Sequence, residues 1–539
     1  MAAPMAQATA AGTKEAILCA ARKFVEFVNK CQSPFHVVEE SRTILKAAGF
    51  SELREADQWD IKPNSKYFVT RNQSTVVAFA VGGKYKPGNG FTIVGAHTDS
   101  PCLKVKPQSN KVKSGYQCVG VECYGGGIWH TWFDRDLMVA GRVMVKNADK
   151  IEHRLVRINR PILRVPNIAI HLMRDHNDKF GPNKETNIVP VLATAVQAQL
   201  EGHTSPKEGE GPKCQADKHP PVLVRLLCEE LGIQREDLLD FELCLADHQP
   251  AAIGGALEEF IFSPRLDNLV SSYCALQGLV ESSGGNGSLT SDPNIRLIAL
   301  YDNEEHAGVE RMEWPSKSPD LDPIEHLWDQ LRRAVRARVT ERTTLADLGR
   351  LLLEEWDAIP QHRIARLVGS ESAQGAASML TEHILRRLSS GDRATCFEEA
   401  VPKSFLLSAD QAHAVHPNYS EKHEDNHKPM LHKGIVIKFN ANQRYATTAV
   451  STSILREVGT LANVPLQDFV VRNDSPCGST IGPILSAKLG MKTVDIGAPQ
   501  LSMHSIREMG CTSSVHQSIA LYRTYFQEYP SIYNRVNVD

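Results

Sequence analysis

A short apolar run leads directly into a histidine and an aspartate in the segment Thr92-Ile93-Val94-Gly95-Ala96-His97-Thr98-Asp99. We predict a buried strand over residues 92–94 that places His97 at its carboxyl end. In open α/β sheets, ligands gather at the carboxyl ends of the strands. The segment therefore predicts an α/β fold with a functional site at this edge of its sheet.

Patterns on both sides of this strand extend the fold. Apolar residues at helical spacing predict a helix over 14–30, and an apolar run predicts a second buried strand over 76–81. Between 102 and 254 the pattern changes to short β-like runs separated by turn residues. After that stretch the α/β alternation returns, with a helix over 268–279 and a strand over 295–301.

We therefore predict a catalytic domain that is interrupted twice. A chain of 539 residues is long enough for several domains. The pieces of the catalytic domain are 1–101, 255–305 and 368–539. The first interruption, 102–254, is a β-rich domain. The second, 306–367, is a helical segment rich in Trp and Arg that does not fit the α/β alternation.

The composition narrows the class of protein. The hydrophobic fraction is 42%, the charged fraction is 23% and the formal net charge is −3, which is ordinary for a globular protein and argues against general binding to nucleic acid. The 12 cysteines are dispersed without a Cys-x-x-Cys pair, which favours reduced thiols in the cytoplasm. We see neither a signal peptide nor an apolar run long enough to span a membrane.

Five short motifs carry metal-binding chemistry when they are taken together. They supply two His, two Asp and one Glu as ligands, with a second Glu to spare, and a two-metal site needs a carboxylate that bridges the ions. The motifs are Gly95-Ala96-His97-Thr98-Asp99, Arg265-Leu266-Asp267-Asn268, Asp302-Asn303-Glu304-Glu305, Ser408-Ala409-Asp410 and Met503-His504-Ser505.

Each motif alone also has a simpler interpretation. His97 can be satisfied by the backbone, and Asp267 can be a helix N-cap. Asp410 can be a turn residue, and His504 a surface histidine. The adjacent carboxylates of Glu304 and Glu305 are different, because two such charges at the end of an apolar strand are costly without a cation. We expect one of them to bind metal and the other to act as a general base.

Longer motifs make the chain similar to a known family over almost all of its length outside 306–367. It resembles the aspartyl aminopeptidases, the M18 family of dinuclear zinc exopeptidases. The motifs are Gly95-Ala96-His97-Thr98-Asp99-Ser100-Pro101, Tyr124-Gly125-Gly126-Gly127-Ile128-Trp129, Trp132-Phe133-Asp134-Arg135-Asp136-Leu137, Ser408-Ala409-Asp410-Gln411-Ala412-His413-Ala414-Val415-His416-Pro417-Asn418 and Asn473-Asp474-Ser475-Pro476-Cys477-Gly478.

The resemblance implies a zinc-exopeptidase α/β/α sandwich with an inserted β-rich dimerisation domain, in dimers that assemble into a tetrahedral dodecamer. It implies two Zn²⁺ ions in each subunit. One would be held by His97, Asp267 and Asp410, and the other by Asp267, Glu305 and His504. Glu304 would be the general base, and Asp99 would support His97.

The resemblance also implies a substrate, namely a peptide with Asp, or less readily Glu, at its N-terminus. An acidic side chain needs a cation in its pocket. By resemblance this cation is Lys438, with His413 and Tyr445 beside it. His171 resembles the family histidine that reaches into the active site of a partner subunit.

The segment 306–367 resembles something else. Its run Trp314-Pro315-Ser316-Lys317-Ser318-Pro319-Asp320 and the residues up to Trp328 are similar to the carboxyl end of a Tc1/mariner-type transposase catalytic domain, in which Glu325 matches the third metal-binding acid. The other two acids have no match in this chain, so we expect no transposase activity. The segment begins one residue after a proposed zinc ligand, and a displacement of about 1 Å there can cost about 100-fold in rate.

Three alternative hypotheses remain. The chain could be a catalytically disabled subunit because the insert disturbs Glu304 and Glu305. It could keep the dinuclear site but act as a deacylase or a broader aminopeptidase. Arginines of the insert could bind nucleic acid, although an exposed helix face explains them more simply.

Overall fold

The computed structural model describes residues 13–176, 180–203, 214–285, 287–305 and 372–538. The predicted insert 306–367 therefore lies outside the described residues, and its predicted helices and its likeness to a transposase stay predictions. The described chain forms two large sheets and two small ones.

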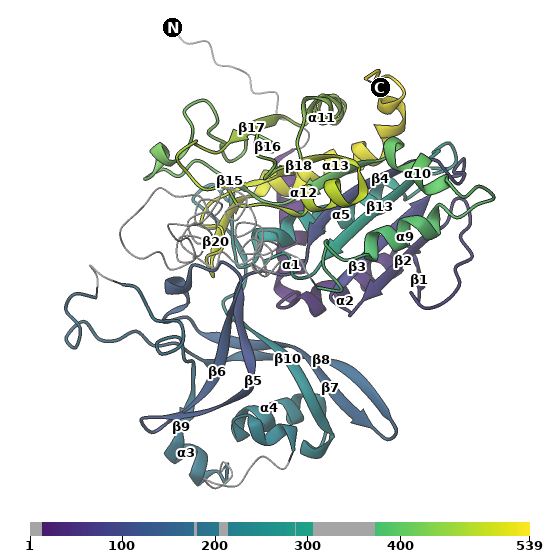
Figure 1. Cartoon of the computed structure of the whole chain (residues 1–539). Coiled ribbons are helices and arrows are strands. Elements are labelled where there is room, and N and C mark those ends of the chain that lie inside the picture. The colour runs from purple at the N-terminus through teal and green to yellow at the C-terminus, as the bar shows by residue number, and fades with distance from the viewer. Residues whose placement is uncertain (1–12, 177–179, 204–213, 286, 306–371, 539) are drawn as a thin grey trace, which may run out of the picture. The chain divides into compact units, whose positions relative to one another are not determined.

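A nine-stranded sheet contains the strand that ends at His97 (Figure 1). Its four central strands, β13, β4, β14 and β18, are parallel to one another, and they are buried along almost their whole length. Such burial on both faces is what parallel strands require. In spatial order the strands are β1 (Ser51–Leu53), β2 (Lys66–Arg71), β3 (Thr75–Val81), β13 (Ile295–Tyr301), β4 (Phe91–His97), β14 (Phe405–Ala409), β18 (Lys492–Gly497), β16 (Ile435–Phe439) and β17 (Leu466–Val470).

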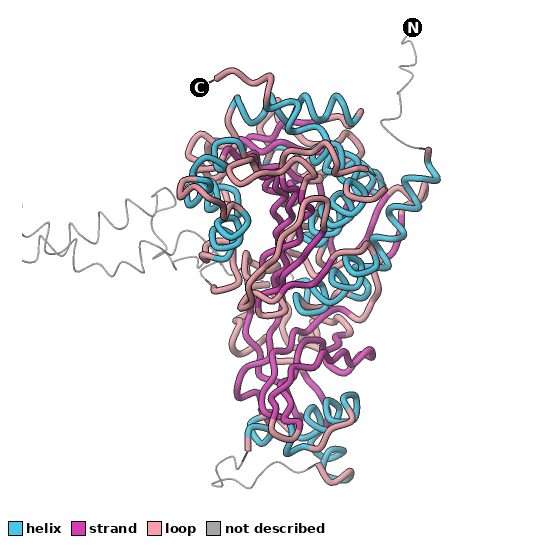
Figure 2. The backbone as a smooth tube through the Cα atoms, turned by 90° about the vertical axis from the view of Figure 1, so that its right-hand side faces the viewer, coloured by secondary structure: helices cyan, strands magenta, loops and turns pink. Residues whose placement is uncertain are grey.

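Helices cover both faces of this sheet, and side chains that alternate along each strand separate two hydrophobic cores. On β4, Val94 and Ala96 join one core, whereas Phe91 and Ile93 join the other. The first core is completed by α1 (Lys14–Lys30), α2 (Pro34–Ala47), α5 (Leu266–Ser282), α11 (Ala449–Ala462) and α13 (Thr512–Tyr533). The second is completed by α9 (Leu380–Leu388), α10 (Cys396–Ala400) and α12 (Ile481–Leu489). Figure 2 shows these helices flanking the strands, which confirms the predicted mixed α/β fold.

A second, six-stranded antiparallel sheet is formed by the chain between β4 and α5. Its own hydrophobic core includes Trp132, Leu227 and Leu243. It accounts for the β-like runs that the sequence shows in this stretch, and its role in dimerisation stays a prediction. The order is β8 (Lys150–Leu163), β7 (Leu137–Asn147), β10 (Leu238–Asp247), β5 (Cys102–Lys113), β6 (Tyr116–Tyr124) and β9 (Val191–Thr194), with α3 (Ala195–Leu200) and α4 (Pro221–Leu231) beside them.

Two small sheets join distant parts of the chain close to the predicted site. The three-stranded one pairs β12 (Phe260–Ser263) with β11 (Ala252–Gly254) on one side and β20 (Glu508–Cys511) on the other. The two-stranded one pairs β15 (Ala412–His413) with β19 (Pro499–Gln500). Asp267 thereby lies just after β12, and His504 lies between β19 and β20.

Within the described ranges, each helix is too short or too polar to cross a membrane.

Tyr525 on α13 offers a test of how the helix layer holds the sheet. Its side chain is fully buried, and its hydroxyl donates to the carbonyl of Phe405 (2.6 Å) while it accepts from the N–H of Ile93 (3.2 Å). We expect Tyr525→Phe to destabilise the protein by about 1–3 kcal/mol, because two buried backbone groups lose their partner. The thermal unfolding midpoint measures this, with Tyr419→Phe at an exposed tyrosine as the control. Equal midpoints for the two variants would contradict the expectation.

Candidate metal centre

Three adjacent parallel strands deliver most of the predicted metal-binding and catalytic residues to one edge of the sheet. His97 is the last residue of β4, and it lies in register with Tyr301, the last residue of β13. Asp302 to Glu305 follow β13 directly, and Asp410 follows β14. The carboxyl ends of these strands meet because the strands are parallel and in register. The structure therefore brings these predicted residues together at the carboxyl edge of the sheet.

Asp267 and His504 reach the same place from outside the sheet. Asp267 is the second residue of α5, where the backbone is not helical (φ −83°, ψ 107°). Its carboxylate does not cap this helix, because its two oxygens point to two different histidines. His504 lies in the loop between β19 and β20 with a positive φ of 66°. The structure thus favours the metal-ligand interpretation of Asp267 over the N-cap.

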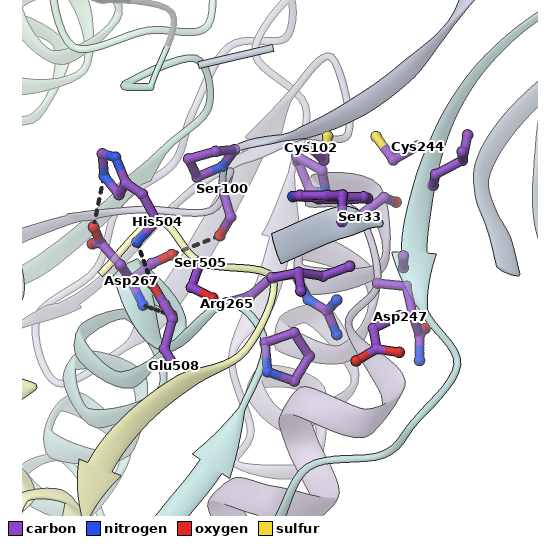
Figure 3. A pocket seen from close by; sticks show the side chains of 18 of the residues that line it. Ser33, Ser100, Cys102, Cys244, Asp247, Arg265, Asp267, His504, Ser505 and Glu508 are labelled. Carbon is purple, nitrogen blue, oxygen red and sulfur yellow. Dashed lines mark hydrogen bonds and ion pairs between the residues drawn. The ribbon is translucent and has the colours of Figure 1, made fainter. Parts of the chain in front are cut away.

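The side chains form two groups that share Asp267, and Figure 3 shows the contact of Asp267 with His504. In the first group, Nε2 of His97 lies 3.5 Å from Asp267 Oδ1, 3.5 Å from Asp410 Oδ1 and 3.7 Å from Glu304 Oε2. In the second, Nε2 of His504 lies 3.3 Å from Asp267 Oδ2 and 3.3 Å from Glu305 Oε1. Each oxygen of the Asp267 carboxylate therefore belongs to a different group, as a bridging ligand requires.

The tautomers of both histidines are set by carbonyl groups. Nδ1 of His97 lies 3.0 Å from the carbonyl oxygen of Asp99, and Nδ1 of His504 lies 3.2 Å from that of Gly126. A carbonyl oxygen only accepts, so Nδ1 carries the proton in both rings. In the neutral form of each ring this leaves the lone pair on Nε2, which faces the carboxylates and is free to bind a metal ion. Metal-binding histidines are held in this way.

The two groups fit zinc in distance and in donor type. Tetrahedral zinc with bonds of about 2.0–2.2 Å to nitrogen and oxygen places its ligand atoms roughly 3.3–3.5 Å apart, which is close to the separations within each group. Asp267 Oδ1 and Glu305 Oε1 are buried and have no hydrogen-bond partner among the residues that the structure describes. Buried polar atoms are rarely left without a partner. A cation in each group would supply one.

The charges of the cluster also favour a bound cation. Burial alone would lower the pKa of His504, but the charge of Glu305 and the hydrogen bond to Asp267 outweigh it and raise the pKa to about 12. Burial likewise opposes the charged form of His97, yet Glu304, Asp267 and Asp410 raise its pKa. The imidazoles are thus held as cations when no other cation balances the carboxylates. The cluster is a cation site by its charge as well as by its shape.

Glu304 and Glu305 are held in place through their backbones. The carboxylate of Asp99 accepts from the N–H of Glu304 (3.2 Å) and of Glu305 (2.9 Å), and also from the hydroxyl of Tyr124 (2.5 Å). Asp99 Oδ1 is 3.4 Å from Nδ1 of His97. Asp99 therefore connects His97 to the turn that carries both glutamates. Burial, and after it the charges of Asp410 and Glu305, raise the pKa of Glu304.

The chain on either side of the undescribed segment 306–371 is tied to the same turn. Gln374 Nε2 donates to Asn303 Oδ1 (3.0 Å). Thr75 Oγ1 donates to the carbonyl of Gln374 (2.7 Å) and accepts from the N–H of Asp302 (2.9 Å). Residues before and after the segment are therefore anchored side by side at Thr75, the first residue of β3.

The four residues predicted to bind substrate are placed differently. His413 and Tyr445 line a cavity of about 300 Å³ that also includes Met503, the neighbour of His504. Lys438 is buried and does not line this cavity; its Nζ lies 5.4 Å from the centroid of the Tyr445 ring and 3.2 Å from Asp410 Oδ2. His171 lies on an exposed turn between β8 and β9.

Three further residues near the site are not predicted from the sequence. Tyr124 is quoted there only as the first residue of a family motif, yet its hydroxyl contacts Asp99. Arg472 lines the cavity and pairs with Asp474. Glu508 contacts the backbones of both Asp267 and His504. Glu508 follows His504 by four residues, but no recognisable motif marks it.

Comparisons with known proteins identify the family. The family model described as Aminopeptidase I zinc metalloprotease (M18) matches residues 27–311 and 366–526, and the gap between the two matches lies within the predicted insert. The Caenorhabditis elegans protein named aspartyl aminopeptidase is 47% identical over 516 residues, which is 95% of this chain and 96% of that protein.

Solved structures are similar over the same extent. A chain in the cryo-EM structure of the Ape4 and Nbr1 complex is 40% identical, with a TM-score of 0.83, and the match covers 98% of this chain and 90% of that one. The mApe1 structure from Chaetomium thermophilum is 29% identical, with a TM-score of 0.75, and the match covers 97% and 100%. With a cluster suited to two cations at the edge of such a sheet, the chain belongs to the M18 family of zinc metallopeptidases.

Proposed function

We propose that this chain is an aminopeptidase that removes Asp, and less readily Glu, from the N-termini of peptides. One observation carries the peptidase function, namely the Asp267 carboxylate with one oxygen in each of two histidine-containing groups. The acidic preference is supported by relatives named aspartyl aminopeptidase, among them the proteins of Caenorhabditis elegans and Dictyostelium discoideum.

In this proposal His97, Asp267 and Asp410 hold one zinc ion, and Asp267, Glu305 and His504 hold the other. When bound, such a pair lowers the pKa of a water molecule and polarises the peptide carbonyl. The protein's own contribution is to fix the donors. The carbonyls of Asp99 and Gly126 set the histidine tautomers, and the Asp99 carboxylate holds the turn of Glu304 and Glu305.

Glu304 is the proposed general base. It is outside both ligand sets, its Oε2 is 3.7 Å from Nε2 of His97, and its backbone is fixed by Asp99. The carboxylate takes a proton from the attacking water and returns it to the leaving amine.

Selection of an acidic residue requires a cation next to the reacting carbonyl. We propose Lys438 for this role, together with His413 and Tyr445 in the cavity beside His504. The ammonium of Lys438 has three N–H donors, so it can donate to Asp410 and to a substrate carboxylate at the same time.

Self-association is also part of the proposal. The turn around His171 exposes the apolar side chains Ile168, Ile170, Leu172 and Met173. An apolar group of this kind on the surface is typical of a protein contact. We propose that it packs against a second copy in a dimer that builds a tetrahedral dodecamer, with His171 at the partner's site. A cytoplasmic location belongs to the same proposal.

The insert is proposed to be a tolerated addition of transposase origin without transposase or nucleic-acid-binding function. Its alternative is a catalytically disabled subunit. The anchoring of Asn303 to Gln374, and of the glutamate backbones to Asp99, favours a site that keeps its geometry.

Replacing Glu304 with Gln tests the general base. We expect kcat for an N-terminal Asp peptide to fall by about 10²–10⁴-fold, because the amide cannot accept the proton. Zinc content should stay at two ions per chain, since Glu304 is outside both ligand sets. Glu281→Gln, at an exposed glutamate, is the matched control. Wild-type turnover in Glu304→Gln would remove Glu304 from this role.

Replacing Lys438 with Met tests the specificity pocket. The ratio of kcat/KM for N-terminal Asp over N-terminal Ala peptides should collapse, because the substrate carboxylate loses its charge partner. Lys433→Met, at an exposed lysine, should keep the ratio. An equal loss for both peptides would instead show that Lys438 acts only by holding Asp410.

Deleting residues 306–367 tests the disabled-subunit alternative. We expect the full chain and the shortened chain both to bind two zinc ions and to hydrolyse the Asp peptide, because Asp99 fixes the glutamates in either form. Activity confined to the shortened chain would establish that the insert disables the enzyme.

A further inference from the structure

Glu508 contacts two of the proposed zinc ligands at once. It is the first residue of β20 and is 3% exposed. Its Oε2 accepts from the N–H of Asp267 at 3.1 Å, and its Oε1 accepts from the N–H of His504 at 2.8 Å. The side-chain amide of Gln500 donates to Oε1 as a third partner, at 3.2 Å. Figure 3 shows Glu508 directly below Asp267 and His504.

These two N–H groups need an acceptor that regular structure does not give them. His504 lies in a loop in which Ser502 and His504 both have positive φ (58° and 66°). Asp267 lies where α5 has not yet taken helical φ and ψ. A buried N–H without a partner is strongly disfavoured. The Glu508 carboxyl group therefore stabilises the two irregular backbones that the ligand positions require.

The remaining anchors are not shared between the two residues. The carbonyl of His504 accepts from the N–H of Ile128 at 2.9 Å, and the carbonyl of Asp267 accepts from Ser100 Oγ at 2.6 Å. Neither contact relates one ligand to the other. Glu508 does so, because a single rigid carboxyl group receives both N–H groups.

We propose that Glu508 is a positioning residue that fixes His504 relative to Asp267 and so sets the zinc affinity of the group formed by Asp267, Glu305 and His504. This inference rests on the proposed function, since it takes those three residues as zinc ligands. The other group is less dependent on Glu508. His97 is held by Asp99, Asp410 by Lys438, and Asp267 keeps its bond from Ser100.

A purely structural role is the competing explanation, because Glu508 also pairs with Ser263 between β20 and β12. If the role of Glu508 were only structural, replacing it would lower the thermal midpoint but would not weaken one zinc ion more than the other. The two explanations therefore differ in the number of tightly bound ions, which can be measured without any assay of activity.

The test compares the full chain with Glu508→Gln, Glu508→Asp and the control Asp292→Asn. Gln keeps the size of Glu but turns an N–H₂ group toward one of the two N–H donors. Asp keeps the carboxyl group but is shorter by one methylene. Asp292 is a buried carboxylate at the opposite end of β13, where it accepts from Asn294 and pairs with Arg296. Zinc per chain is measured in zinc-buffered solution with a competing chelator, and thermal midpoints are recorded on the metal-free proteins.

We expect two tightly bound zinc ions in the full chain and in Asp292→Asn. Glu508→Gln should keep one tight ion and bind the second about 10- to 100-fold more weakly, the usual effect of losing a group that supports a metal ligand. If Glu508→Gln does not fold, Glu508→Asp gives the same test. Two tight ions in a folded Glu508 variant would overturn the proposal. Fewer than two ions in the unmodified chain would instead overturn the dinuclear site itself.

Discussion

The concentration of buried carboxylates at one edge of the sheet is the constraint on which the rest of the structure depends. Asp267, Glu304, Glu305 and Asp410 surround two imidazoles. Two like charges 4 Å apart repel by about 4 kcal/mol at an effective dielectric constant of about 20. Such a cluster persists only where the fold supplies counter-charge and rigid anchors. In the proposed function zinc ions provide the counter-charge, and backbone groups around the cluster provide the anchors.

The anchors come from both large sheets. Tyr124 is the last residue of β6 in the second sheet, and its hydroxyl donates to Asp99. In the loop that follows β6, the carbonyl of Gly126 accepts from His504. A Cβ atom at Gly126 would lie 3.3 Å from His504 Nδ1, so a larger residue there would require the ring to shift by a few tenths of an ångström. The chain of the second sheet thus supplies contacts to the proposed metal centre.

The sequence predicted the parts of this site that obey local rules. The strand before His97 and the strand before Asp302 could be predicted because buried parallel strands are continuous apolar runs. Asp267 could not be assigned from its surroundings, since a residue at a helix start is equally well explained as a cap. Its role depends on two histidines that are distant in sequence. Glu508 and Tyr124 act through backbone groups and through Asp99, and such contacts leave no pattern in one sequence.

The hydrogen bond between Asn303 and Gln374, with Thr75 bonded to both Asp302 and Gln374, has a consequence for how sequences of this family can change. Residues on either side of the segment 306–371 contact each other at one point of the core. Loop-closure entropy grows only slowly with length, by about 0.6 kcal/mol for each doubling. A segment inserted between two points that are already neighbours does not require the core to separate. Foreign coding sequence can therefore be inserted into an enzyme gene at this junction, even though the junction is only a few residues from the proposed general base and zinc ligand.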